Sequence, residues 1–225
     1  MKQEVKDTLT GLSVIILYLL SKYILLFILM ILKINPNNLS ILGKSICNIL
    51  YQLSLLGIIV LIYKKIIIKH LKQFKHSHFA SYIRYWIIAI ILMTLSNMLI
   101  NMFTHIDTST NQQMIEANFT KSPISTILSV IVIAPILEEL VFRLSFRKIF
   151  KTDILFIILS GLFFGIMHLA NASSLLELLY IIPYSIPGMI FAYTLTKSKN
   201  IFVPIGLHCL HNSLMVILQL LIIFK

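Results

Sequence analysis

Apolar residues gather along the chain in seven long runs that short polar segments separate. The runs cover approximately residues 11–32, 45–63, 85–103, 124–147, 154–171, 175–196 and 201–224. A helix needs roughly 20 apolar residues to cross the hydrocarbon core of a bilayer, and a helix satisfies its own backbone hydrogen bonds there. The pattern therefore predicts an all-α, polytopic transmembrane helix bundle of about seven spans.

Composition excludes a soluble globular domain. Of the 225 residues, 58% are hydrophobic and 12% are charged, whereas soluble domains carry roughly 25% charged residues. The first run is too long for a signal peptide and no A-x-A-like site follows it, so we expect no cleavable leader. Cys47 and Cys209 lie inside apolar runs, which indicates packing rather than a disulfide framework. We expect two parts, residues 1–110 with about three spans and residues 111–225 with about four.

The formal charge of +11 is concentrated in alternate connections between the runs. The basic connections contain Lys64, Lys65, Lys69, Lys72, Lys75 and Arg84, then Arg147, Lys148 and Lys151, then Lys197 and Lys199. Residues 104–123 hold only Lys121, and residues 169–174 hold no basic residue. Lysine and arginine favour the cytoplasmic side, so the N-terminus, with Lys2 and Lys6, is expected inside. This alternation is typical of membrane topology and argues against a nucleic-acid partner.

Two further expectations follow from single residue types. Abundant Ile, Lys and Asn favour a bacterial source and hence the bacterial cell membrane. Lys22 lies midway along the first run, where it can either face the bundle or snorkel to the interface.

Ionisable residues interrupt the fourth run, where they are costly and indicate function. Glu139 and Arg143 are four residues apart on a helix, so they share a face and can pair. Glu138 points about 100° away from Glu139 and has no such built-in partner. Pro135 lacks an N–H, frees a backbone carbonyl upstream and can kink the helix.

Polar residues also occur at depth in the fifth and seventh runs. His168 lies 15 residues after Asp153 and Glu138 lies 15 residues before it, so a hairpin turning there brings both to the same depth. His208 and Asn212 share a helix face, with His211 a weaker candidate beside them. Each of these residues alone fits a packing role, but their occurrence on three spans at compatible depths favours one site.

At this point the sequence resembles a known family. Glu138-Glu139-x-x-x-Arg143, Phe164-x-x-x-His168 and His208-x-x-x-Asn212 match the three motifs of the CPBP family of intramembrane proteases in order and spacing. The family is also called Abi or CaaX-protease-like, and the resemblance covers about residues 120–225. One departure is Leu144, where family members often have Gly.

The resemblance implies a role for each motif residue. Glu138 and His168 would activate a water molecule, while His208 and Asn212 would donate hydrogen bonds to the developing oxyanion. Glu139 and Arg143 would hold the site together. Glutamate-based catalysis without a cofactor is favoured, and the alternative is a zinc ion held by Glu138, His168 and His208.

The sequence therefore predicts an intramembrane endopeptidase that acts on a membrane-embedded or membrane-associated peptide. Its expected partners are a peptide or membrane-protein substrate and the lipid bilayer, and the family resemblance suggests peptide-signal maturation or bacteriocin immunity as its role. One alternative is a non-catalytic membrane protein that binds a peptide, a transporter or a kinase through the same cavity. A second is a proton-coupled carrier, which the absence of repeated halves disfavours.

Overall fold

The structure is a computed structural model in which residues 2–74 and 76–223 are described, without the side chains of residues 76–78, 222 and 223. Its main helices are α1 (Lys2–Ile31), α2 (Ile41–Gln73), α3 (His76–Thr104), α4 (Thr110–Lys121), α5 (Pro123–Leu128), α6 (Ala134–Glu139), α7 (Phe146–Ile149), α8 (Asp153–His168), α9 (Ile181–Ser198) and α10 (Phe202–Ile223). Two short 3₁₀ segments are η1 (Pro36–Asn38) and η4 (Leu176–Tyr180), and two π-helical segments are η2 (Ser129–Ile133) and η3 (Leu140–Ser145).

The helices confirm a polytopic bundle of about seven spans. Within the described part of the chain, six stretches are long and apolar enough to cross a membrane, and the fourth of them joins α5 through α7 as Pro123–Ile149. The helix α8 is apolar but has only 16 residues. At 1.5 Å per residue it is about 24 Å long, a few ångströms less than a typical hydrocarbon core.

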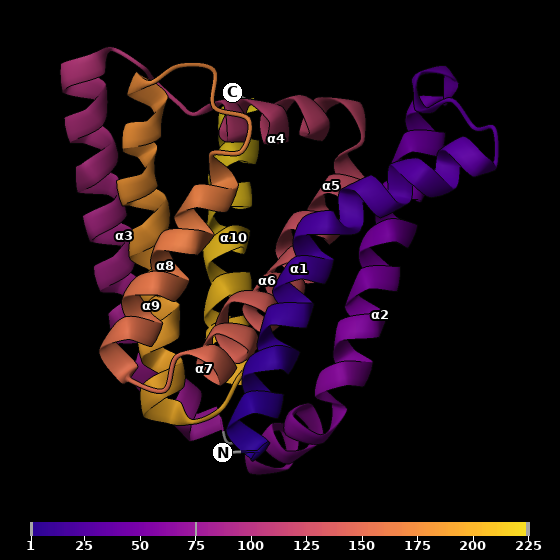
Figure 1. Cartoon of the computed structure of the whole chain (residues 1–225). Helices are drawn as coiled ribbons and strands as arrows, with labels where there is room; N and C mark the ends of the chain where they lie inside the picture. Colours follow the sequence, from indigo (N-terminus) through magenta and orange to yellow (C-terminus); the bar gives the residue numbers. More distant parts are fainter. Residues whose placement is uncertain (1, 75, 224–225) are drawn as a thin grey trace.

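The helices extend further than the apolar runs. The helix α2 continues through Lys64 and Lys72 to Gln73, so these basic residues lie on helical turns and not in a loop. The polar segment predicted as a loop before Pro123 contains α4, which lies across one end of the bundle (Figure 1). Lys22 is exposed, so it does not face the interior of the bundle.

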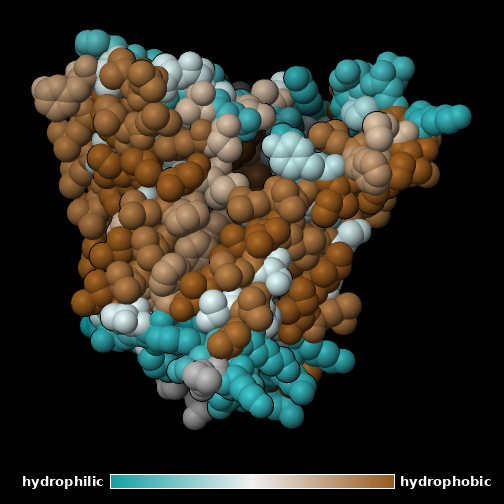
Figure 2. All heavy atoms as spheres, in the orientation of Figure 1, coloured by the Kyte–Doolittle hydropathy of each residue, from teal (hydrophilic) through white to brown (hydrophobic). Residues whose placement is uncertain are grey.

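The basic connections gather at one end of the bundle, as the alternation predicted. Lys148 in α7 forms an ion pair with Asp7 in α1 at 2.5 Å. Asn200, between α9 and α10, donates a hydrogen bond to the carbonyl of His70 in α2 at 2.7 Å. Figure 1 shows the N-terminus and these turns together at the lower end, and Figure 2 shows a hydrophilic band there beneath a broad hydrophobic zone.

Small residues bring α8 and α9 into close contact. Gly161 and Gly165 are four residues apart on α8 and face Ser185, Gly188 and Met189 of α9. An added Cβ at Gly161 would lie 2.8 Å from the backbone nitrogen of Met189. Membrane helices commonly approach through such small-residue faces, because lipid supplies no hydrophobic drive for their association. This contact fixes the position of α8, which carries His168.

Candidate active site

The two glutamates lie in a short α-helical segment between two π-helical segments. In η2 the N–H of Ala134 bonds to the carbonyl of Ser129, five residues back. Continued by one residue, this pattern would pair Val130 with Pro135, which has no N–H to donate. Asn212 of α10 supplies the missing donor, since its Nδ2 lies 2.8 Å from the Val130 carbonyl oxygen. The freed carbonyl predicted at Pro135 is thus satisfied from another span. Such π-helical turns frequently occur at functional sites.

Glu139 and Arg143 form a fully buried ion pair, as their spacing predicted. Both side chains are 0% exposed, and Arg143 reaches the two carboxylate oxygens at 2.8 and 3.1 Å. Arg143 Nη1 also donates to the hydroxyl of Ser160 at 2.6 Å, and that hydroxyl donates to the Phe142 carbonyl. The pair therefore ties the fourth span to α8 and leaves Arg143 no free charge to offer a ligand.

His208 connects the two glutamates. Its Nδ1–H donates to Oε1 of Glu139 at 3.0 Å, and its Nε2 lies 3.8 Å from Oε2 of Glu138. A carboxylate on one ring nitrogen fixes the orientation of the imidazole and directs the other nitrogen outward. Glu138 is 17% exposed and has no hydrogen bond to any other described residue. The two adjacent carboxylates thus have different environments.

His168 joins this group through an aromatic ring rather than through Glu138. The ring of Phe164 lies 4.6 Å from the His168 ring and 5.5 Å from the His208 ring, measured between centroids. The Nδ1–H of His168 donates to the Phe164 carbonyl at 2.8 Å, and Tyr184 stacks on its ring. Nε2 of His168 is therefore the nitrogen available to a ligand.

A cavity of about 350 Å³ lies beside these residues, within the size range of ligand sites. Its inner wall includes His168, His208, His211 and Asn212, and most of the remaining wall comes from α3, α4, α9 and the rest of α10. Glu138 does not line the cavity. Its Oε2 lies 3.8 Å from Nε2 of His208, and His208 does line the cavity. A group bound against His208 therefore comes close to the Glu138 carboxylate.

Two arrangements that the sequence allowed are not formed. Among the described residues, Glu138 and His168 share no hydrogen bond or ion pair: the Nδ1 of His168 bonds to the Phe164 carbonyl, and the imidazole beside Glu138 is that of His208. No three His, Cys, Asp or Glu side chains in the described part of the chain are placed to hold one metal ion. Glu138, His168 and His208 as they lie thus do not fit a three-ligand zinc site.

Sequence patterns did not reveal several residues that shape the site. Ser160 and Phe191 both lie within predicted apolar runs. Ser160 accepts a hydrogen bond from Arg143, and the ring of Phe191 stacks on that of His208 with 5.1 Å between the centroids. Glu177 in η4 is 3% exposed and accepts hydrogen bonds from Thr110 and Ser173. His211, expected to be a weaker candidate, lines the cavity, and its buried Nδ1 has no partner. The spacing of residues in the sequence does not predict these contacts, because each contact joins segments distant in sequence or depends on the rotation of a helix about its axis.

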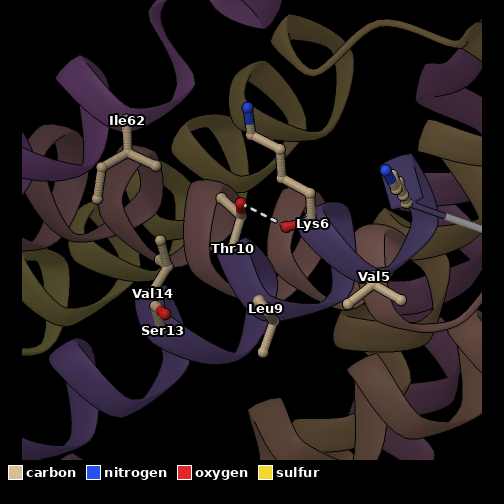
Figure 3. Close-up of a pocket in the computed structure, with 8 residues that line it drawn as sticks. Val5, Lys6, Leu9, Thr10, Ser13, Val14 and Ile62 are labelled. Carbon is tan, nitrogen blue, oxygen red and sulfur yellow. Dashed lines mark hydrogen bonds between the residues drawn. The ribbon is translucent and has the colours of Figure 1, made fainter.

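A second groove, of about 480 Å³, lies at the basic end and has no candidate residue in its wall. Figure 3 shows Lys6, Thr10 and Leu9 of α1 facing it, with Ile62 from α2 on the other side. The Thr10 hydroxyl in its wall donates to the Lys6 carbonyl at 2.8 Å, as the dashed line marks. The cavity beside His208 is therefore the candidate site.

Comparisons with known proteins agree with the motif resemblance. Residues 120–214 match the family described as type II CAAX prenyl endopeptidase Rce1-like. The chain is 36% identical over 115 residues to the Bacillus subtilis (strain 168) protein named "Putative membrane peptidase YdiL". That match covers 50% of this chain and 44% of the relative, so the chain spans less than half of the relative's length in the match. No solved structure matches. Residues 120–214, which contain all three motifs, are thus similar in sequence to the Rce1-like (CPBP) family, and this similarity falls within a multi-pass membrane protein.

Proposed function

We propose that this protein is an intramembrane endopeptidase of the CPBP type, in which Glu138 is the general base. One observation carries the proposal: Arg143 and His208 occupy Glu139 completely, whereas Glu138 is partly exposed beside the outward-facing nitrogen of the same histidine. A base needs a carboxylate that is not already neutralised and that water can reach. Of the two glutamates only Glu138 meets both conditions.

The reaction follows from the placement of these groups. Glu138 takes a proton from a water molecule, and the resulting hydroxide attacks the carbonyl carbon of the scissile peptide bond. The carbonyl oxygen becomes an oxyanion as the tetrahedral intermediate forms. Glu138 then returns the proton to the amide nitrogen, so that the C–N bond breaks and the amine leaves. No Ser or Cys nucleophile is required.

Two donors are available to the developing oxyanion. His208 would offer Nε2–H with a proton on both ring nitrogens, and its Nδ1–H bond to Glu139 orients the ring. Asn212 uses one Nδ2 hydrogen for the Val130 carbonyl and retains the second for a ligand. Removing one oxyanion donor typically costs about 10²–10³ in rate. We assign His168 the task of orienting the water or the peptide through its available Nε2.

We propose that catalysis has no obligatory metal ion. Glu138, His168 and His208 do not form a three-ligand cluster, and the steps above are complete without one. Exhaustive chelation of the purified protein is expected to leave cleavage unchanged. Loss of cleavage on chelation and its recovery with Zn²⁺ alone would contradict this part of the proposal.

The experiment that tests the proposal is a peptidome comparison between cells that express the wild type and cells that express Glu138→Gln. The variant is expected to lose cleavage by about 10²–10⁴-fold, because its amide cannot accept the proton of water. His168→Ala is expected to lose cleavage as well. Glu116→Gln, on α4 and outside the cavity wall, is the matched control that keeps it. Full cleavage by both Glu138→Gln and His168→Ala would overturn the protease assignment.

The substrate is expected to be a membrane-embedded or membrane-associated peptide in a bacterial cell membrane. Maturation of peptide signals and immunity to bacteriocins are the roles that fit such a reaction. The alternative, a non-catalytic partner of a peptide, transporter or kinase, predicts that Glu138→Gln keeps the cellular phenotype.

A further inference from the structure

The cavity beside His208 is not centred in the bundle but extends toward one end of it. Its inner limit is His208, which is 2% exposed, and the lining continues along α10 through Met215 to Gln219. At its far limit lie the exposed Asp107, in the α3–α4 connection, and Asn111, in the first turn of α4. The cavity therefore reaches the surface where α4 crosses the bundle (Figure 1).

The opposite direction is closed by packed side chains. Between His208 and the α9–α10 turn lie Leu207, Val203 and Ile201, which are 0%, 1% and 0% exposed. Phe79, Tyr82 and Trp86 of α3 pack against this group. Glu139 and Arg143 on the facing span are equally inaccessible. Among the described residues, no wall residue of the cavity belongs to the basic connections, whereas Asp107, Thr108, Ser109 and Asn111 at the α4 end do line it, so the polar mouth of the cavity lies at the α4 end.

The charge distribution assigns a side of the membrane to each end. The basic connections meet at the end away from α4, where Lys148 pairs with Asp7 and Asn200 binds the His70 carbonyl. In the described part of the chain, the α4 end carries few lysines or arginines, namely Lys33, Lys44 and Lys121. An excess of lysine and arginine marks the cytoplasmic side of a membrane protein. The mouth of the cavity then faces the outside of the cell.

Hydrogen bonds hold α4 over this mouth. The Glu177 carboxylate accepts from the backbone N–H and the hydroxyl of Thr110 at the start of α4, and from Ser173 in the connection after α8. The Ser109 hydroxyl bonds to that of Tyr184 at 2.5 Å. Because α8 is short, the backbone between Leu169 and Leu175 is irregular near the membrane, which is tolerated where it borders a water-filled cavity. These hydrogen bonds thus fix the position of α4 over the opening of the cavity.

We infer that the catalytic cavity is entered from the extracytoplasmic side, beneath α4, and that the substrate is a peptide segment exposed on the outer face of the membrane. The nature of the substrate rests on the function proposed above, whereas the side of entry does not. The wall contains amides, hydroxyls and aromatic rings, and its one charged residue besides the histidines is Asp107. Without a lysine or arginine to bind a terminal carboxylate, the cavity suits an internal segment of a peptide rather than a free C-terminus.

Cysteine accessibility in intact cells tests the side of entry without a known substrate. In a Cys47→Ala, Cys209→Ala background, single cysteines are placed at Met215 in the cavity wall and at Ile217, which is 54% exposed on the lipid-facing side of the same helix. Asn37→Cys and Lys151→Cys, both at exposed positions in turns at opposite ends, report the two sides of the membrane. A membrane-impermeant maleimide is added before or after permeabilisation.

We expect Met215→Cys and Asn37→Cys to be labelled in intact cells and Lys151→Cys only after permeabilisation. Ile217→Cys should remain unlabelled, since a thiol in lipid does not ionise to the reactive thiolate. Gln219→Cys repeats the test nearer the mouth, should Met215→Cys fail to fold. Labelling of both cavity positions only after permeabilisation, or not at all, would overturn the inference. Labelling of Lys151→Cys but not Asn37→Cys in intact cells would overturn it too.

The effect of external labelling on cleavage tests the route of the substrate. Labelling Met215→Cys from outside is expected to abolish the cleavage seen in the peptidome comparison, and labelling Asn37→Cys is expected to leave it intact. If Glu138→Gln abolishes cleavage but the external label on Met215→Cys does not, the route is wrong and the protease assignment stands. If the label enters from outside but Glu138→Gln keeps cleavage, the cavity opens outward and the protease assignment fails.

Discussion

Glu138 and Glu139 are neighbours in sequence, yet their side chains have separate surroundings. The bundle buries Glu139 completely between Arg143 and His208, while the side chain of Glu138 remains partly exposed. A buried ion pair is costly to break, because removal of one partner leaves the other charge without compensation. The more hidden carboxylate is therefore expected to support the fold, and the more exposed one to support catalysis.

This division predicts opposite effects of single substitutions on stability. Arg143→Ala should destabilise the protein by about 3–5 kcal/mol, because it removes the guanidinium that compensates the buried Glu139 carboxylate and leaves it the His208 hydrogen bond alone among the described residues. Glu139→Gln should also lower the melting temperature of the detergent-purified protein, whereas Glu138→Gln should leave it within error of the wild type. Thermal unfolding followed by tryptophan fluorescence measures all three. Equal destabilisation by Glu138→Gln and Glu139→Gln would contradict the division.

At the scale of elements, the position of α8 depends on its glycines. An added Cβ at Gly165 would lie 3.0 Å from the Ile181 carbonyl oxygen and in contact with the Ser185 hydroxyl. Gly161 is similarly close to Met189. Because backbone atoms limit both sites, α9 must move away to admit a methyl group, and His168 and Ser160 would move with α8.

Gly161→Ala and Gly165→Ala are thus expected to lower both the melting temperature and the cleavage rate. The matched control is Gly57→Ala in α2, where an added Cβ meets nothing within 4 Å. That variant should retain activity and lose no stability, since Ala is the better helix former. A loss at Gly57 comparable to the loss at Gly165 would contradict the assignment of the effect to the α8–α9 contact.

The π-helical turn before the glutamates predicts an energetic coupling between two spans. Asn212→Ala removes the donor to the Val130 carbonyl and should cost about 1–3 kcal/mol for the unsatisfied group. Pro135→Ala restores a backbone N–H that can reach that carbonyl, so Asn212→Ala should cost less in that background. A double-mutant cycle on unfolding free energy measures the coupling. Additive effects would mean that Pro135 does not create the need for Asn212.

At the scale of the whole molecule, the arrangement of spans could be predicted from the sequence, because run length and charge alternation reflect the bilayer directly. The pairing of Glu139 with Arg143 was equally predictable, since both lie on one helix. The helix α4 was missed because Thr110–Lys121 is polar and has no apolar period. The partner of Glu138 was also missed: depth alone suggested His168, but helix rotation and the Phe164 carbonyl leave His208 as the nearer imidazole.

The buried Glu139–Arg143 pair also has a consequence for how the chain is made. The fourth span emerges from the ribosome before Ser160 and His208, which complete its hydrogen bonds, have reached the membrane. Arg143 alone raises the apparent free energy of inserting this span into the membrane by about 2.5–3.5 kcal/mol on translocon-based scales. A chain truncated after residue 150 should therefore insert this segment less completely than the full chain in a microsomal glycosylation assay. Glu139→Leu with Arg143→Leu should restore insertion of the truncated chain, and equally complete insertion without these changes would contradict the expectation. The span that carries the two glutamates is then expected to reach its final position in the membrane only after segments that follow it in the chain.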